Sequence, residues 1–268
     1  MIRWGILGLG RAGRARARAI QACEHSVLVA GFRGDPASFG LTPSPTVEAL
    51  FAECDAVAVC SPDPTHPQLV RAALDAGRHV VCEYPLAPSR RVARELFALA
   101  EARQRILHVE HIELLAGSQQ ALRRFVAETR VLGGTLHDQP SASGGVGRSP
   151  LSRLHRLVDL FGLPERVSRG KLSFGTLEVR RETLVGPGSA RTGPGLSLRT
   201  ARGLLGLERG RLTLDGAPVP LEPTPGLFAL DHAFAVRRIL EGGDPYVSEE
   251  RVLSVLEILE SWCGGQPR

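Results

Sequence analysis

The chain is poor in several residue types, and each shortage limits what the protein can be. Lysine occurs once, at Lys171, and there are two tyrosines, two tryptophans and one methionine. No hydrophobic run approaches the roughly 20 residues of a membrane-spanning helix, so we expect no membrane association. The five cysteines form no Cys-x-x-Cys pair and show no metal-site spacing, so we expect reduced thiols and no metal. The first strand-like run begins at residue 2, which leaves no room for a signal peptide and predicts a cytoplasmic protein.

Positive charge is in excess but is not concentrated in one segment. The formal net charge is +5 and the isoelectric point is near 9.3. Almost all of this charge is arginine, spread along the chain without a nucleic-acid recognition motif, so we expect no nucleic-acid partner. Arginine binds carboxylate and phosphate groups with paired hydrogen bonds, which favours an anionic small molecule as the partner.

A glycine-rich turn follows the first apolar run and organises the amino-terminal part. Residues 2–7 have the length of a buried strand, residues 14–22 have a helical pattern, and Gly8-Leu-Gly10-Arg-Ala-Gly13 lies between them. In this position Gly-x-Gly-x-x-Gly is a dinucleotide-binding fingerprint. Gly8 permits a tight turn, Gly10 lets the backbone approach a pyrophosphate, and Gly13 lets helix and strand pack closely. The predicted phosphate-binding residues are Gly8, Gly10, Arg11, Ala12 and Gly13.

The second predicted strand, residues 27–32, ends at a residue that distinguishes the two nicotinamide cofactors. An NAD-selective fold usually carries Asp or Glu here, but this chain has Arg33. A cation suits the 2′-phosphate of NADPH, and we predict that cofactor. Asp35 lies two residues further on and leaves NADH usable.

Strand and helix patterns alternate through the first 115 residues and then give way to another pattern. The alternation predicts an α/β fold with a doubly wound parallel sheet, a Rossmann domain over residues 1–115. Residues 116–268 predict an α+β domain with a mainly antiparallel sheet, whose last helix, residues 248–262 with Ser248 as its cap, packs back on the first domain. The remaining expected elements are strands at 56–60, 79–82, 106–112 and 133–137, helices at 67–77, 88–103, 116–129, 150–161 and 228–240, and a Gly/Ser loop at 141–149.

A Rossmann pattern followed by Glu-x-Pro and an α+β domain resembles the oxidoreductase family that includes glucose–fructose oxidoreductase and inositol dehydrogenase. The sugar-oxidising members carry a catalytic lysine in a Glu-Lys-Pro tripeptide, but this chain has Tyr84 in Glu83-Tyr-Pro85. A later helix of those enzymes supplies a His and an Asp, where this chain has Ser152 and His155. The groups that remove a hydroxyl proton in a sugar dehydrogenase are therefore missing.

Four further segments resemble the biliverdin reductases of the same fold family more closely. They are Glu83-Tyr-Pro-Leu86, Leu107-His-Val-Glu-His-Ile-Glu-Leu-Leu115, the Ser152-Arg-Leu helix that ends in Leu160-Phe-Gly162, and Gly193-Pro-Gly-Leu196. The resemblance implies transfer of a hydride from NADPH to the central methine carbon of a linear tetrapyrrole, with a proton going to a pyrrole nitrogen. Such chemistry needs a partly apolar slot and arginines for two propionates, but no metal or nucleophile.

Site residues follow from this resemblance and from the predicted strand ends. The candidate catalytic residues are Tyr84, Arg153, Glu110 and Glu113; further cofactor-binding candidates are Ser61, His66, Glu83 and Tyr84; and substrate-binding candidates are Arg148, Arg153, Arg156 and Arg199. For Arg153 we favour charge stabilisation with water as the acid, because a guanidinium is a poor proton donor. Glu110 and Glu113 either fix neighbouring arginines, contact the pyrroles or form an ion pair at the domain joint. Two other functions stay open, a sugar-type oxidoreductase with altered catalytic groups and a non-catalytic NADP-binding sensor.

Overall fold

The computed structural model describes residues 1–138, 148–168, 170–183, 195–208 and 210–263. The chain divides into two compact units. Unit 1 contains Met1–Ile112 and Pro225–Leu253, and unit 2 contains Glu113–Thr224 and Ser254–Arg268. The assignment of separate functions to residues 1–115 and 116–268 stays a prediction.

Unit 1 is built on a parallel five-stranded sheet, sheet A, with the order β2-β1-β3-β4-β5. Its strands are β1 (Ile2–Leu7), β2 (Ser26–Phe32), β3 (Ala56–Val59), β4 (His79–Cys82) and β5 (Leu107–Val109). Strand β1 pairs with both β2 and β3, although β3 follows β2 in the chain. The order therefore reverses beside β1, and in such sheets ligands bind outside the carboxyl ends of the strands at this point.

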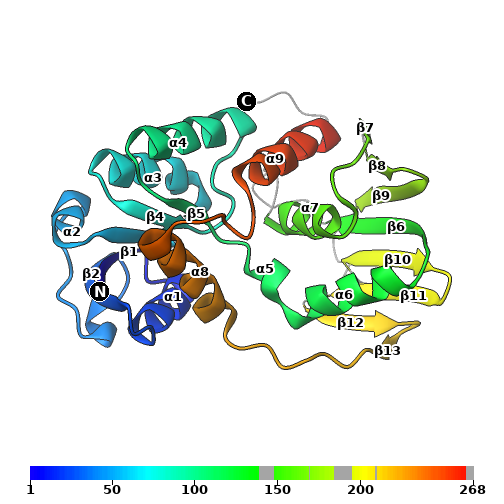
Figure 1. Cartoon of the computed structure of the whole chain (residues 1–268), viewed down its shortest axis with the longest axis horizontal. Helices are drawn as coiled ribbons and strands as arrows, with labels where there is room; N and C mark the ends of the chain where they lie inside the picture. Colours follow the sequence, from blue (N-terminus) through cyan, green and yellow to red (C-terminus); the bar gives the residue numbers. More distant parts are fainter. Residues whose placement is uncertain (139–147, 169, 184–194, 209, 264–268) are drawn as a thin grey trace. The chain divides into compact units, whose positions relative to one another are not determined.

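Helices cover both faces of sheet A (Figure 1). Helices α1 (Arg11–Gln21) and α8 (Leu227–Glu241) lie on one face, and α2 (Val47–Glu53), α3 (His66–Asp75) and α4 (Arg90–Ala102) lie on the other. The core under α1 and α8 includes Trp4, Ile6, Ile20, Ala235 and Val236, all nearly inaccessible to solvent. Burial on both faces explains why the strands of this sheet are continuous apolar runs.

The predicted strand over residues 106–112 is wrong at its carboxyl end. Strand β5 stops at Val109, and the short helix α5 (Ile112–Leu115) begins three residues later. The Glu110 amide still donates to the Cys82 carbonyl of β4, but the His111 amide donates to the side-chain oxygen of Tyr246. The His111 amide faces away from β4, at the open edge of sheet A, and Tyr246 supplies its acceptor where the chain turns into α5.

Unit 2 contains sheet B, which has eight strands in the order β13-β12-β11-β10-β6-β9-β8-β7. Only β6 and β9 pair in parallel within this described order, so the predicted, mainly antiparallel sheet is confirmed. The strands are β6 (Val131–Asp138), β7 (Arg166–Ser168), β8 (Lys171–Phe174), β9 (Leu177–Thr183), β10 (Leu196–Thr200), β11 (Gly203–Glu208), β12 (Arg211–Leu214) and β13 (Ala217–Pro218). Gly193 and Pro194 of the predicted sheet segment lie outside the described residues.

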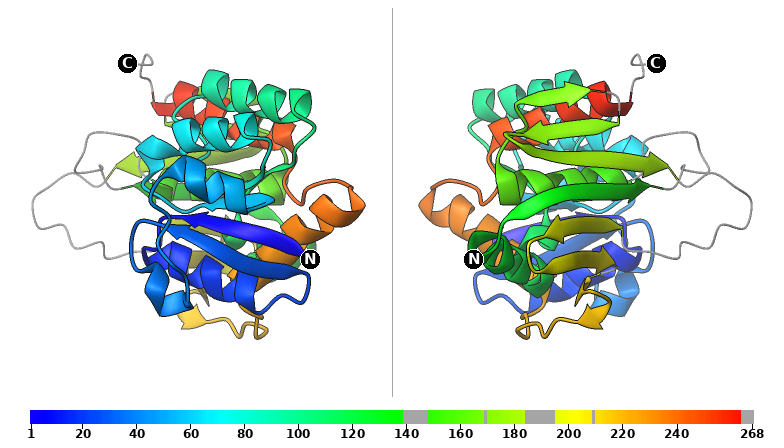
Figure 2. Two further views of the ribbon diagram at one scale, coloured as in Figure 1. Left: turned by 90° about the vertical axis from the view of Figure 1, so that its left-hand side faces the viewer. Right: turned by 90° about the vertical axis from the view of Figure 1, so that its right-hand side faces the viewer.

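One face of sheet B is apolar and the other is polar. Leu136, Val179 and Leu198 are buried on the face that packs against α6 (Gly117–Glu128) and α7 (Arg148–Phe161). Alternate residues, such as Thr135, Arg180 and Arg199, point to the opposite face, whose strands are turned toward the viewer in Figure 2 (right). This alternation is typical of an antiparallel sheet with one covered face.

Two helix boundaries near sheet B and in the carboxyl-terminal segment test the sequence patterns. Arg148, expected in a loop, is the first residue of α7, and the helix accommodates Pro150 because the first turn needs no donor from that residue. Helix α9 (Glu249–Cys263) follows Ser248, whose Oγ accepts the Arg251 amide at 3.2 Å, so the predicted cap is confirmed.

No helix among the described residues is long and apolar enough to cross a membrane.

Candidate dinucleotide and active site

The glycine-rich turn after β1 has the geometry that its sequence predicts. Gly8 has φ of +95°, and a Cβ there would lie 2.8 Å from the Cys60 carbonyl oxygen of the neighbouring strand end. A Cβ on Gly13 would lie 1.9 Å from the Gly8 carbonyl oxygen, so only glycine fits. Gly10 differs, because nothing lies within 4 Å of a Cβ at that position.

The amino terminus of α1 suits an anion. The helix begins at Arg11, three residues earlier than expected, so Gly13 belongs to its first turn. No side chain caps this terminus, and the first turn contains no acidic residue. Amides at a helix start carry partial positive charge and bind phosphate. The open space at Gly10 and the uncapped first turn therefore fit the pyrophosphate of a dinucleotide, with Arg11, Ala12 and Gly13 in the binding turn.

Arg33 lies directly beside this turn. The Gly8 amide donates to the Phe32 carbonyl at 2.9 Å, and the Leu9 amide donates to the Arg33 carbonyl at 3.1 Å. Arg33 is exposed, has φ of +64°, and holds its guanidinium 5.5 Å from the centre of the Phe32 ring. Asp35 is engaged elsewhere, because its carboxylate accepts the Ser38 amide at 3.3 Å. At the end of β2, where the ribose of the cofactor is predicted to bind, the available side chain is therefore the cationic Arg33.

His66 and Ser61 join the strand-end loops of β3 and β4. The His66 ring is fully buried, and its nitrogens lie 2.8 Å from the carbonyl oxygens of Pro85 and Ser61. Thr65 Oγ1 donates to the Pro62 carbonyl, so the Ser61 hydroxyl donates to Thr65 Oγ1 at 2.7 Å. Both ring nitrogens of His66 therefore contact protein atoms, and the ring contributes to the site by holding these two loops.

Tyr84 lies where β4 ends. The preceding residue, Glu83, is buried and donates its amide to the Val59 carbonyl at 3.1 Å. The half-buried Tyr84 ring stacks on the His111 ring, with centroids 5.8 Å apart and planes 12° apart. The structure thus brings together the ends of β4 and β5, which carry the predicted Glu83, Tyr84 and Glu110.

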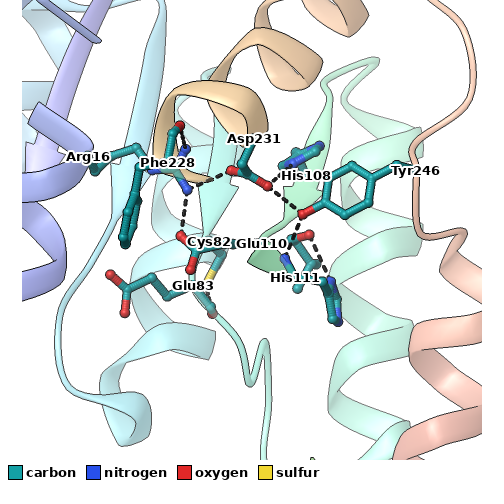
Figure 3. Close-up of polar contacts among 10 residues, drawn as sticks. Arg16, Cys82, Glu83, His108, Glu110, His111, Phe228, Asp231 and Tyr246 are labelled. Atoms are coloured by element: carbon teal, nitrogen blue, oxygen red, sulfur yellow. Dashed lines mark hydrogen bonds and ion pairs between the residues drawn. The ribbon is translucent and has the colours of Figure 1, made fainter. Parts of the chain in front are cut away.

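A buried charge cluster supports these strand ends (Figure 3). The Arg16 guanidinium in α1 lies 2.5 Å from Glu110 Oε2 and 2.6 Å from Asp231 Oδ2 of α8. Asp231 Oδ1 contacts His108 Nε2 at 3.0 Å and accepts the Tyr246 hydroxyl at 2.5 Å. Of the alternatives for Glu110, the structure shows the one in which it fixes a neighbouring arginine, within unit 1.

The pKa values of the two carboxyl groups of this cluster shift in opposite directions, up for Glu110 and down for Asp231. Burial raises the pKa of Glu110 to about 8, and the nearby Arg16 only partly opposes this. Burial also disfavours ionised Asp231, but Arg16 and the hydrogen bond from His108 hold the pKa of that carboxyl below its usual range. Burial therefore disfavours a second carboxylate anion beside the single Arg16 cation, and of the two carboxyl groups Glu110 is the one whose ionised form is disfavoured more.

Sequence reasoning missed Arg16, Asp231, His108 and Tyr246. A signal exists for two of them: Arg16 occupies the apolar face of α1 beside Gly13 and Ile20, and Asp231 interrupts a mostly apolar helix. Charged residues on an apolar helix face are almost always paired when buried. The partners could not be identified from the sequence. Arg16 and Glu110 are 94 residues apart, and His108 and Asp231 are 123 apart. Asp231 and Tyr246 are 15 apart but do not share a helix or strand.

The remaining candidates belong to unit 2. Arg153 of α7 donates to the His137 carbonyl of β6, and the buried Arg156 donates to Gln119 Oε1 at 3.0 Å. Arg199 lies on the opposite face of sheet B, so the structure does not bring it together with the α7 arginines. Glu113 is buried in α5, and the side chain of Arg148 lies outside the described residues.

A parallel sheet with this glycine turn, an uncapped helix start and a strand order that reverses beside the turn defines a dinucleotide-binding Rossmann protein. Residues 2–111 match the family described as "Oxidoreductase family, NAD-binding Rossmann fold". The predicted fold is thereby confirmed, and the match agrees with the predicted family.

Three known proteins show how the similarity is distributed. Biliverdin reductase A of Mus musculus is 34% identical over 188 residues, 66% of this chain and 62% of the mouse protein, so the match spans less than two thirds of that relative. UDP-N-acetylglucosamine 3-dehydrogenase of Acidithiobacillus ferrooxidans is 30% identical over 128 residues, 46% of this chain and 41% of that protein. The crystal structure of biliverdin reductase from Synechocystis sp. PCC 6803, in complex with biliverdin and NADP+, superposes with a TM-score of 0.77 and 26% identity over 98% of each chain.

Proposed function

We propose that the protein is an NADPH-dependent reductase of biliverdin or a related linear tetrapyrrole and that it works in the cytoplasm. The observation that carries the proposal is Tyr84 at the end of β4, where the sugar-oxidising relatives have a lysine. The single lysine of the chain, Lys171, is in β8 and forms an ion pair with Glu178. Similarity to the mouse and Synechocystis reductases supports the same conclusion.

The residues of this chain would divide the work as follows. Bound NADPH supplies the hydride, and the central methine carbon of the substrate receives it while a proton goes to a pyrrole nitrogen. Gly8, Gly10 and the first turn of α1 hold the pyrophosphate, and Arg33 holds the 2′-phosphate. Ser61, His66 and Glu83 form and support the loops around the nicotinamide.

The proposal gives roles to side chains of each unit. In unit 1, Tyr84 packs against the nicotinamide or the tetrapyrrole, and the buried Glu110 holds Arg16 behind the strand end. Glu113, buried in α5, is a further candidate. Arg153 stabilises negative charge while water delivers the proton, and Arg148 and Arg156 are the weaker candidates for the propionates. Arg199 lies on the other face of sheet B and is not assigned to the same substrate as the α7 arginines. An arginine pairs with a propionate through two parallel hydrogen bonds.

A direct assay tests the proposal. Purified protein mixed with NADPH and biliverdin should lose the green absorbance of biliverdin and gain the yellow band of bilirubin. Absence of this change, with NADPH binding intact, would reject the proposed substrate. A sugar-type oxidoreductase, which the similarity to UDP-N-acetylglucosamine 3-dehydrogenase favours, would instead reduce NAD(P)+ when given a nucleotide sugar. A sensor would bind NADPH and consume neither substrate.

The role of Arg153 needs a variant and a matched control. Arg153→Gln keeps a donor for the His137 carbonyl but removes the charge, so kcat for biliverdin should fall about tenfold or more, as for loss of a charge-assisted contact. Arg123→Gln removes an arginine that pairs with Asp159 and is half exposed, and it should leave kcat within twofold. Full turnover in Arg153→Gln would remove this residue from the proposed chemistry.

A further inference from the structure

The hydroxyl of Tyr246 connects the carboxyl-terminal segment of unit 1 to the site strands. It accepts the backbone N–H of His111 at 2.7 Å and donates to Asp231 Oδ1 at 2.5 Å (Figure 3). His111 follows β5, whereas Asp231 and Tyr246 come much later in the chain. One phenolic oxygen therefore joins the site strand to α8 through two hydrogen bonds.

The Asp231 end of this connection is fixed. Its carboxylate is fully buried and is held by Arg16 at 2.6 Å and by His108 at 3.0 Å. These partners come from α1 and β5, so three elements of unit 1 meet at one side chain. A buried group with several hydrogen bonds has little freedom to move, and it can serve as a rigid anchor.

The other end of the connection reaches Tyr84. The buried His111 ring contacts the Val109 carbonyl through Nδ1 at 3.0 Å and stacks on Tyr84. A carbonyl only accepts, so Nδ1 carries the proton and donates. Because burial lowers the pKa of His111 to about 4, the ring stays neutral near pH 7. The two tyrosines of the chain are thus linked through a single histidine, one by its amide and one by its ring.

We infer that Tyr246 and Asp231 are positioning residues that hold His111 in place and thereby set the position of the Tyr84 ring at the end of β4. This inference rests on the proposed function only for the catalytic consequence, in which Tyr84 borders the reacting rings. The geometric part, that the Tyr246 hydroxyl controls the Tyr84 ring, stands on the contacts of unit 1 alone.

Tyr246→Phe is a clean variant for this purpose. The Tyr246 ring packs against Phe234 and His108, with centroids 5.0 and 5.5 Å away, so a phenyl ring should remain in place without the hydroxyl. Ser26→Ala is the matched control. It also removes a buried hydroxyl, which contacts Trp4 Nε1 at 3.1 Å and His232 Nε2 at 3.0 Å. Neither of these contacts involves His111, Tyr246 or Tyr84.

The first readout is independent of any reaction. In protein labelled with 13C-tyrosine, Tyr246→Phe leaves one signal, that of Tyr84, because the chain has two tyrosines. Its ring shift should move or broaden relative to the wild type, and it should stay at the wild-type value in Ser26→Ala. An unchanged Tyr84 signal in Tyr246→Phe overturns the inference, whether or not biliverdin is reduced.

The second readout tests the catalytic consequence. In Tyr246→Phe, kcat for biliverdin should fall about fivefold or more while the NADPH dissociation constant changes less than twofold, and Ser26→Ala should retain the wild-type kcat. In a Tyr84→Leu background the added Tyr246→Phe should have no further effect, because its route to the substrate is gone. Equal effects in both backgrounds would show that Tyr246 acts in another way. A chain that does not reduce biliverdin but shows the expected Tyr84 shift would reject the proposed function and keep the positioning role.

Discussion

At the scale of a single residue, Arg33 makes the most direct prediction about the cofactor. Arg33→Asp should weaken NADPH binding by about 10- to 100-fold, as expected for the loss of a charged hydrogen bond and the addition of repulsion, and should improve NADH binding. Dissociation constants for both cofactors, measured by the fluorescence of the reduced nicotinamide, check this.

The matched control makes the same change in net charge at another position of unit 1. Arg18→Asp alters an exposed arginine in the last turn of α1, far along the helix from the phosphate-binding end. It should leave the ratio of the two dissociation constants near the wild-type value. If Arg33→Asp and Arg18→Asp gave the same ratio, the 2′-phosphate would have another partner.

The residues of the site divide into those that a motif can reveal and those that it cannot. The conformations of Gly8 and Gly13 were predictable because they depend on the local backbone, and Arg33 was identified by its distance from the fingerprint, with its role at the 2′-phosphate still a prediction. Tyr84 and Glu110 were predictable from resemblance. Asp231 and Tyr246 were not, because their contacts with His108 and His111 span more than 120 residues and their contact with each other joins a helix to a loop, and neither kind leaves a periodic pattern.

At the scale of an element, two glycines of the turn between β1 and α1 are expected to have different roles, Gly13 in stability and Gly10 in cofactor binding. Gly13→Ala would place a methyl group 1.9 Å from the Gly8 carbonyl, and the resulting strain should lower stability by about 1–3 kcal/mol. Gly10→Ala has open space around the new Cβ and φ of −70°, which alanine adopts readily. It should unfold at nearly the wild-type temperature but bind NADPH at least tenfold more weakly, because the methyl group occupies the approach of the pyrophosphate. Thermal unfolding and NADPH titration of the two variants check this, and normal NADPH binding by Gly10→Ala would place the phosphates elsewhere.

Element patterns predicted most of the fold because the pattern of each element depends on its burial. Strands β1, β3 and β4 are buried on both faces, which makes them short apolar runs that stand out from the helices. The failures came where another segment decided the outcome. Strand β5 ends early where the chain turns into α5 and Tyr246 accepts the His111 amide. Helix α7 begins at Arg148, within a stretch that glycine and serine content had marked as a loop.

At the scale of the whole molecule, buried titratable groups give stability two opposing dependences on pH. Burial lowers the pKa of His232 to about 3 and that of His111 to about 4, from ordinary values of 6.5. As the pH falls below 6.5 the unfolded chain binds protons that the folded protein refuses, so the free energy of unfolding decreases. Glu110 acts in the other direction. Its raised pKa, about 8 against 4.5, lets the folded protein keep a proton that the unfolded chain loses, so stability falls as the pH rises from 4.5 to 8.

Two variants should each weaken one of these two pH dependences of stability. In urea unfolding at pH 5, 6.5 and 8, His232→Gln should lose less stability than the wild type between pH 6.5 and 5, by up to about 1.4 kcal/mol per pH unit. At pH 8 the imidazole is neutral in both the folded and the unfolded chain. The difference in free energy of unfolding between His232→Gln and the wild type at this pH therefore measures the cost of the lost contacts alone. Glu110→Gln should instead flatten the decline between pH 6.5 and 8. Between pH 6.5 and 5 it should lose more stability than the wild type, because it lacks the stabilisation that the protonated Glu110 gains as the pH falls toward 4.5. If His232→Gln and the wild type lost stability in parallel between pH 6.5 and 5, the ring beside Trp4 and Ser26 would be protonated in the folded protein, and the assignment of a neutral buried imidazole would be wrong.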